Sequence, residues 1–209
     1  MSLDVLGRKF ARLTTNAVVR RPGLWRMFRA LVRRQFDAVA PRWETIRMPD
    51  SLAPFETGLE AVDPPPRRAL DLGTGTGAGA RAVASRFPGV EVVGADLSER
   101  MLAEARRALP AELAARVRFE VADASRLPYD DAAFDLVTLA NMIPFFDELA
   151  RVVAPRGQVL IAYSSGAETP IYVPSERLRS ELERRGFTEF AEFAAARGAA
   201  LLARKGGQG

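Results

Sequence analysis

The sequence has no histidine and no cysteine among its 209 residues. Without histidine there is no Ser–His or Cys–His pair to activate a nucleophile, and there is no imidazole to bind zinc. Without cysteine there are no disulfides and no thiolate metal sites. Chemistry at this protein must therefore use carboxylates, hydroxyls, amides, arginines or a bound cofactor, and we predict no metal site.

Long apolar runs are missing as well. No window approaches the roughly 18 apolar residues of a membrane span, and the first residues lack the apolar core of a signal peptide. The composition, 48% hydrophobic and 27% charged, is that of a globular protein. We therefore expect a soluble, cytoplasmic protein with one full core.

Lysine is nearly absent, so arginine carries the positive charge. Residues 1–50 contain 11 basic and 4 acidic residues, a balance of +7, while residues 51–209 contain 19 and 22, a balance of −3. A basic segment of this kind suits nucleic acid, anionic lipid or an acidic substrate, and it is equally compatible with a solvated helix face.

The three prolines at positions 64–66 divide the chain, because proline can neither continue a helix nor donate to a strand ladder. Before them, apolar residues recur at helical spacing over residues 3–17 and again over 24–36, with a break at 21–23. We predict an N-terminal helical arm over residues 1–63 and a main domain over residues 64–209.

After the prolines, strands and helices alternate. The predicted strands are residues 69–72, 90–95, 117–122, 134–140, 157–163, 187–193 and 199–203. Four helices are predicted. The first follows the glycine-rich segment and ends near residue 87, and the others span about residues 98–109, 145–153 and 176–185. Alternation of this kind predicts an α/β fold with a mostly parallel sheet covered on both faces.

A glycine-rich loop joins the first strand to the first helix of this domain. Residues 70–79 read LDLGTGTGAG, and such a loop brings backbone and free helix amides close to a ligand. The loop also satisfies the dinucleotide pattern, so a nicotinamide or flavin cofactor is an alternative. Asp71 favours a cation over a pyrophosphate, and S-adenosylmethionine carries a sulfonium and an ammonium but no phosphate.

Polar residues follow the next three strands. Asp96 comes 23 residues after Gly73, where an acid can accept both ribose hydroxyls. Asp123 ends the third strand, and Asn141 follows the fourth. Open α/β sheets bind ligands at the carboxyl ends of their strands, so these side chains are expected at one ligand-binding edge.

Five segments in order resemble the class I S-adenosylmethionine-dependent methyltransferases (the Methyltransf_11/25-like family). They are the glycine loop, GADLS at 94–98, DASRLPY at 123–129, FDLV at 134–137 and RVVAPRGQVL at 151–160. The resemblance covers about residues 67–205, and QFDAVAPRW at 35–43 resembles the lead-in segment that folds over the cofactor. It implies a three-layer Rossmann-like fold with a seven-stranded, mostly parallel sheet and an N-terminal helical extension.

The resemblance also implies S-adenosyl-L-methionine as cofactor and a set of residues that bind it. The set is Asp71, Gly73, Thr74, Gly75, Gly77, Asp96, Leu97, Met101, Asp123, Ala124 and Asn141. The glycines would line the methionine and ribose, and Asp96 would bind the ribose diol with Leu97 and Met101 against the adenine. Asp123 would bond the adenine amine, Ala124 would contribute its amide, and the last residue of the set would lie near the methionine.

The methyl acceptor is less well marked. Residues 141–145 read NMIPF, which is not the D/N-P-P-F/Y tetrapeptide of nucleic-acid methyltransferases, so nucleic acid is not expected and we predict a small-molecule acceptor. The alternatives are an RNA or other macromolecular acceptor, a non-catalytic S-adenosylmethionine-binding protein and a nicotinamide oxidoreductase. No catalytic residue is singled out.

The arm is expected to pack over the cofactor edge as a lid that shapes the acceptor pocket, because the apolar stripe of residues 24–36 must be buried against something. The alternative is a helix lying on a membrane surface, since apolar residues flanked by arginines are also typical of peripheral membrane contact.

Overall fold

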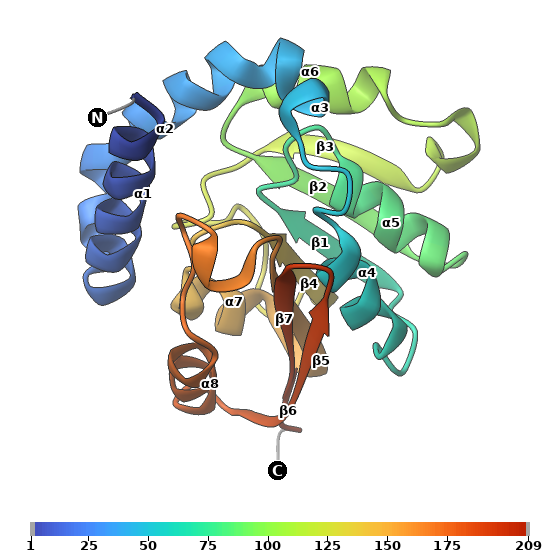
Figure 1. Ribbon diagram of the computed structural model, residues 1–209. Coiled ribbons are helices and arrows are strands. Elements are labelled where there is room, and N and C mark those ends of the chain that lie inside the picture. Colours follow the sequence, from blue (N-terminus) through green and yellow to red (C-terminus); the bar gives the residue numbers. More distant parts are fainter. Residues whose placement is uncertain (1–2, 208–209) are drawn as a thin grey trace.

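A twisted, seven-stranded sheet forms the centre of the computed structural model, which describes residues 3–207 (Figure 1). The strand order is β3-β2-β1-β4-β5-β7-β6, and β7 alone runs antiparallel to its neighbours. The strands are β1 (Arg68–Leu72), β2 (Glu91–Asp96), β3 (Val117–Val121), β4 (Phe134–Ala140), β5 (Val153–Tyr163), β6 (Phe187–Ala195) and β7 (Gly198–Lys205). The predicted α/β fold is confirmed.

Helices cover both faces of the sheet. They are α1 (Leu3–Arg20), α2 (Trp25–Val39), α3 (Trp43–Ile46), α4 (Ala53–Glu60), α5 (Ala78–Arg86), α6 (Glu99–Arg107), α7 (Phe146–Val152) and α8 (Ser175–Glu183). Short 3-10 helices lie at Pro22–Leu24, Ala40–Arg42, Ala111–Leu113 and Gly166–Glu168.

Two buried clusters, one on each face, hold the three layers together. Alternate residues of a strand point to opposite faces, so Leu70 belongs to one cluster and Ala69 to the other. The first cluster packs under α7 and α8, and the second packs under α4, α5 and α6. The central strands β1 and β4 are buried on both sides, which explains why their sequences are nearly continuous apolar runs.

The helix α4 is absent from the sequence-based prediction. Its sequence, APFETGLE, contains a proline and a glycine and offers too short a stripe to show helical periodicity. The structure gives the glycine a packing role, because a side chain at Gly58 would overlap Leu160 of β5. Phe55 and Leu59 of this helix are fully buried against the sheet.

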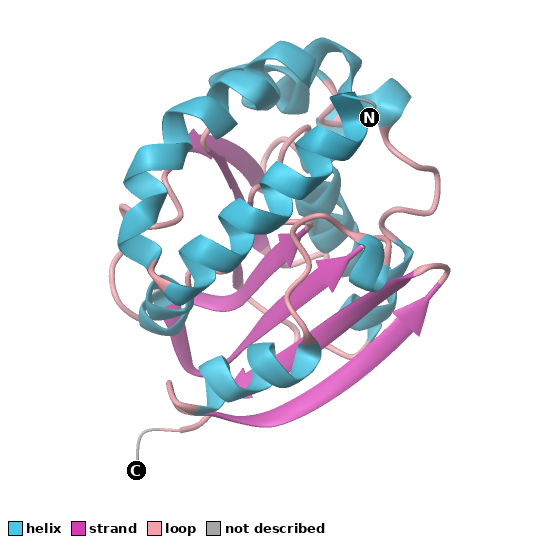
Figure 2. Ribbon diagram, turned by 60° about the vertical axis from the view of Figure 1, so that its left-hand side comes forward, coloured by secondary structure: helices cyan, strands magenta, loops and turns pink. Residues whose placement is uncertain are grey.

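The remaining N-terminal helices form an arm that crosses the carboxyl ends of the central strands (Figure 2). Here the arm means residues 3–46, from α1 to α3. Its inner side is apolar, since Val18, Trp25 and Phe145 form a buried cluster of their own. The domain boundary at residue 63 stays a prediction, although α4, which precedes it, packs with the sheet rather than with the arm.

Candidate cofactor site

A cavity of about 520 Å³ lies at the carboxyl edge of the sheet, beneath the arm. That volume is in the range of small-molecule sites. Segments that follow β1, β2, β3, β4 and β5 form its floor, and α1, α2 and the segment from α3 to residue 52 form its roof. Of the eleven predicted cofactor residues, all except Gly77 line it.

The glycine loop adopts a left-handed backbone, with φ of +65° at Gly73, +54° at Gly75 and +80° at Gly77. A Cβ on Gly75 would approach nothing closer than the Trp43 Nε1 atom at 3.9 Å, so this glycine borders open cavity. A Cβ on Gly77 would lie 2.8 Å from the Phe119 ring. Gly77 therefore serves helix packing behind the loop, and a direct contact with the cofactor stays a prediction for this residue.

Asp71 lies under the loop and is almost fully buried. Its carboxylate accepts hydrogen bonds from the Thr74 hydroxyl at 2.6 Å and the Thr138 hydroxyl at 2.7 Å, and from the Ala80 backbone N–H. Both oxygens are thus engaged by the protein, and the geometry gives this residue the role of holding the loop on the sheet. Burial raises the pKa of Asp71 from 3.8 to about 6.

This raised pKa predicts a pH dependence of stability. Because the folded state binds the proton of Asp71 more tightly than the unfolded state, its stabilising contribution is full below about pH 4 and is lost as the pH rises through about 6. The expected loss is on the order of 3 kcal/mol. The free energy of unfolding in urea should fall by this amount between about pH 4 and pH 7 in the native chain, relative to its change in Asp71→Asn. Stability curves that stay parallel would contradict the prediction.

Asp96 is fixed at the end of β2 by two backbone donors. The Gly75 N–H donates to Oδ2 at 2.9 Å, and the Ser98 N–H donates to Oδ1 at 2.8 Å. Burial raises the pKa of this carboxyl despite these bonds. Leu97 and Met101 line the same part of the cavity. A held carboxylate with free lone pairs beside an apolar wall suits a ribose and its base.

Asp123 at the end of β3 is bonded to the arm, which the sequence did not reveal. The Trp25 indole N–H donates to Oδ1 at 2.8 Å, and Arg29 forms an ion pair with Oδ2 at 3.3 Å. Ser125 donates to Oδ1 through both its N–H and its hydroxyl. Burial alone would raise the pKa of Asp123, but these bonds hold it below its ordinary value. Oδ2, with only the long Arg29 contact, is the atom left to accept from a ligand.

Asn141 follows β4 with a left-handed φ of +53°. Its side-chain oxygen accepts the Ser164 N–H at 2.9 Å, which ties the ends of β4 and β5 together at the cavity floor. Met142, the next residue, covers Gly73, because a Cβ there would lie 2.8 Å from the Met142 sulfur. Both residues stand between the part of the cavity near Asp96 and the part near β5.

The part of the cavity near β5 has apolar walls beside polar ones. The apolar walls come from α1, from the segment after β4 and from the segment after β5: Phe10, Met142, Ile143, Phe145, Pro170 and Ile171. The polar lining residues of the same three segments are Arg8, Thr14, Asn141, Ser164, Ser165, Glu168 and Thr169. The carboxylates of α7 are engaged elsewhere, since Glu148 binds Arg151 and Asp147 binds Arg185. Glu168 lines the cavity but pairs with Arg197. Among residues 3–207, no group of His, Cys, Asp or Glu is arranged to hold a metal.

Hydrogen bonds and one ion pair hold the arm over the cavity on two sides, near the end of β3 and near the end of β5. On the β3 side the contact is Trp25 and Arg29 with Asp123. On the β5 side, Arg8 and Arg12 donate to backbone oxygens of Ala167, Glu168 and Thr169 at 2.8–3.1 Å. These contacts explain why the arm lies across the edge rather than against one face.

Comparison with known proteins agrees with this geometry. Residues 69–157 match a family model described as a methyltransferase domain. A demethylmenaquinone methyltransferase of Thermus thermophilus is 40% identical over 141 residues, which are 60% of this chain and 62% of that protein. A malonyl-[acyl-carrier protein] O-methyltransferase of Halorhodospira halophila is 38% identical over 68% of this chain and 50% of that protein. Over these residues the chain is similar to the class I methyltransferases.

Solved structures agree on the fold of this chain. Phosphoethanolamine N-methyltransferase 2 of Haemonchus contortus, in complex with S-adenosyl-L-methionine, superposes with a TM-score of 0.61 at 21% identity, covering 75% of this chain and 52% of that one. The resemblance inferred from the sequence is thus confirmed. The chain spans 62% and 50% of the length of the two relatives named above. The roles of the residues assigned to the cofactor stay predictions. No described helix is both long and apolar enough to cross a bilayer.

Proposed function

We propose that this methyltransferase binds S-adenosylmethionine beneath the arm and transfers its methyl group to a small, apolar acceptor. The observation that carries the proposal is that one cavity contains the carboxylates of Asp96 and Asp123 and, beside β5, a group of apolar walls. The two regions follow the strand order, so a ligand held by its ribose at β2 extends past β1 toward the apolar walls.

The residues of the cavity fit this cofactor. Asp96 would accept from the ribose hydroxyls, and Asp123 Oδ2 would accept from the adenine amine, since each carboxylate is already fixed by protein donors. The open space above Gly75 leaves room for the chain between ribose and methionine. The sulfonium of the bound cofactor supplies an activated methyl group. The protein's own contribution is then to align the acceptor and to exclude water, which together can supply about 7–11 kcal/mol of a barrier.

The names of the relatives support a small acceptor without choosing one. They include a methyltransferase of demethylmenaquinone, one of phosphoethanolamine and one of a malonyl group on a carrier protein. The apolar walls beside β5, which include Phe10, Phe145 and Ile171, favour an acceptor with an apolar surface.

A second candidate function comes from one solved neighbour. The cyclase SpnF superposes with a TM-score of 0.56 at 21% identity, so its name describes a different reaction on the same fold. A chain of this architecture that binds S-adenosylmethionine without transferring its methyl group is therefore the alternative to test.

The test is transfer of a labelled methyl group from S-adenosylmethionine to fractionated pools of apolar metabolites, polar metabolites and RNA. We expect labelled product in the apolar pool, with S-adenosylhomocysteine formed in equal amount. Tight cofactor binding without label in any pool would favour the non-catalytic alternative, and label in RNA alone would overturn the small-molecule proposal.

The arm provides a further prediction about this site. If it is the lid of the cavity, bound cofactor should slow hydrogen exchange of the amides in residues 24–45, because closure removes local openings. The Trp25 bond to Asp123 should mediate part of this effect. In Trp25→Phe, which keeps a ring against Phe145, we expect weaker protection by the cofactor. Exchange in residues 24–45 that is identical with and without cofactor would show that the arm is not a lid.

A further inference from the structure

Exposed apolar side chains gather in the arm and in the segment that follows it. Seven large hydrophobic residues are exposed within the described part of the chain, and six of them precede residue 50. The six are Phe10, Leu13, Met27, Leu31, Ile46 and Met48. Apolar surface concentrated in this way on one part of a molecule marks a site of contact with another body.

Three of these residues share one face of a helical pair. Helices α1 and α2 pack side by side, with the rings of Phe10 and Phe28 6.2 Å apart. Each helix turns its buried residues, such as Val18 and Trp25, toward the domain. Leu13, Met27 and Leu31 are placed by the helical period on the opposite side, where they are 70%, 74% and 53% exposed. We call this side the outer face of the arm.

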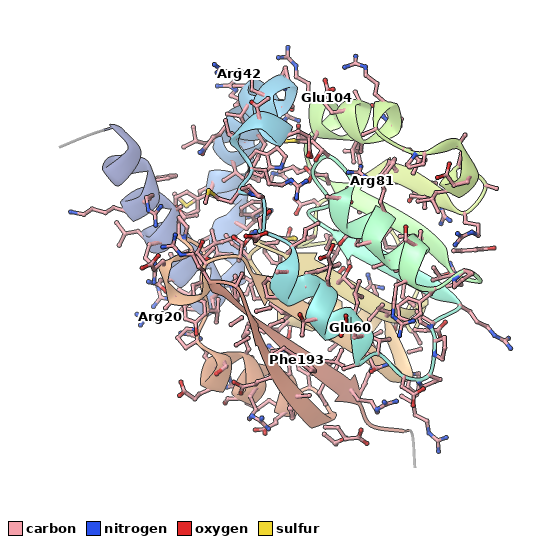
Figure 3. The ribbon with its side chains drawn as sticks, turned by 45° about the vertical axis from the view of Figure 1, so that its right-hand side comes forward. Arg20, Arg42, Glu60, Arg81, Glu104 and Phe193 are labelled. Atoms are coloured by element: carbon pink, nitrogen blue, oxygen red, sulfur yellow. The ribbon has the colours of Figure 1, made fainter. Side chains whose placement is uncertain are left out.

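The outer face is surrounded by positive charge. Residues 5–36 contain no acidic residue. Three of their basic residues bind inward to carbonyl oxygens or to Asp123. The other six are exposed, and among residues 3–207 none of their side chains forms an ion pair: Lys9, Arg20, Arg21, Arg26, Arg33 and Arg34. Figure 3 labels Arg20, at the end of α1, on the outside of the molecule.

We propose that the outer face of the arm docks on the surface of an anionic lipid bilayer. Arginines at the headgroup level gain from the negative surface potential, and aliphatic side chains among them enter the boundary of the acyl chains. Nucleic acid would use the charge but would leave Leu13, Met27 and Leu31 without partners, because it is bound by stacking on aromatic rings rather than on aliphatic side chains. The inner side of the same helices still roofs the cavity, so lid and membrane contact use opposite sides of the arm.

Docking on a bilayer would bring the cavity close to an apolar acceptor, a consequence that rests on the proposed function. Phe10 is exposed and also lines the cavity, and it lies one helical turn from Leu13 on α1, so the rim of the cavity reaches the edge of the outer face. An apolar acceptor dissolved in the bilayer would reach the cavity without crossing water.

The test is flotation of the full chain with vesicles of phosphatidylcholine, alone or mixed with phosphatidylglycerol. We expect capture only by the mixed vesicles and release at high salt. Each arginine near an anionic surface is worth roughly fivefold in partitioning. The triple variant Arg26→Gln, Arg33→Gln and Arg34→Gln should therefore lose about a hundredfold. A matched variant, Arg67→Gln, Arg86→Gln and Arg156→Gln, has the same net charge but changes residues before β1, at the end of α5 and within β5, and it should bind as the native chain does.

The aliphatic residues are tested in the same assay. Leu13→Ser, Met27→Ser and Leu31→Ser together should weaken capture at least tenfold. Val121→Ser, at the exposed large hydrophobic residue that lies outside the group of six in residues 3–207, should not. The proposal is overturned if vesicles are ignored, if both charge variants lose capture equally, if RNA displaces the vesicles, or if Leu13, Met27 and Leu31 instead mediate a dimer. S-adenosylmethionine binding, measured in each variant, should be unchanged. If the native chain does not bind S-adenosylmethionine, the proposed function is wrong, and the docking result is judged from the vesicle assay alone.

Discussion

Replacing Asp96 with alanine is expected to weaken S-adenosylmethionine binding between tenfold and several hundredfold. The carboxylate is partly buried and is held by the N–H groups of Gly75 and Ser98, so it meets a ribose without reorganisation. Hydrogen bonds to a charged group contribute about 1.5–3 kcal/mol each, and water in the vacated space recovers part of this. Isothermal titration of the variant with S-adenosylmethionine measures the loss directly.

The matched control for this variant is Asp135→Ala. The Asp135 carboxylate also accepts two backbone N–H groups, those of Arg67 and Arg68 at 2.9 and 3.0 Å, but it lies at the start of β4, far along the strand from the cavity. Asp135→Ala should lower the stability of the protein without changing its dissociation constant for S-adenosylmethionine. If the two variants bind S-adenosylmethionine equally well, Asp96 does not hold the ribose.

Gly75→Leu is expected to abolish cofactor binding while leaving the fold intact. A side chain there would point into open cavity, because nothing lies closer to a Cβ than Trp43 Nε1 at 3.9 Å. The left-handed backbone adds a strain of about 1–2 kcal/mol, which a domain of this size tolerates. We expect at least a hundredfold loss of affinity, since the leucine fills the space that the proposed ligand needs.

Gly186→Leu separates the strain from the obstruction. Gly186 also has a positive φ, of +88°, and a Cβ there meets nothing within 4 Å, but it follows α8 outside the cavity. The two variants should show similar falls in melting temperature, and only Gly75→Leu should lose S-adenosylmethionine. Retained affinity in Gly75→Leu would move the ligand away from the glycine loop.

The sheet was predictable from the sequence because each of its strands carries a local signal. Strands such as β1 and β4 are short apolar runs that are followed by Gly73 and Asn141, and the parallel order follows from the helices between them. The ends of β1, β2, β3 and β4 could be placed at one edge for the same reason. The sequence-based prediction therefore brought Asp96 and Asp123 together without any knowledge of distances.

The contacts made by the arm were not predictable in the same way. Trp25 and Asp123 are 98 residues apart in the chain and meet through a single indole hydrogen bond, for which no periodicity or motif gives a signal. For Asp71, the sequence suggested a ligand contact where the structure shows contacts within the protein. Its charge suggested contact with a cation, but both its oxygens accept hydrogen bonds from Thr74, Thr138 and Ala80. Side-chain partners of this kind depend on tertiary packing.

The central claim is that the cavity beneath the arm takes S-adenosylmethionine and not a dinucleotide. Isothermal titration of the full chain with S-adenosylmethionine, NAD and NADP under identical conditions tests it most directly. We predict saturable binding of S-adenosylmethionine and no measurable heat from either dinucleotide, because the negative charge of Asp71 beneath the loop disfavours a pyrophosphate. Saturable NAD or NADP binding that is tighter than binding of S-adenosylmethionine would contradict the account.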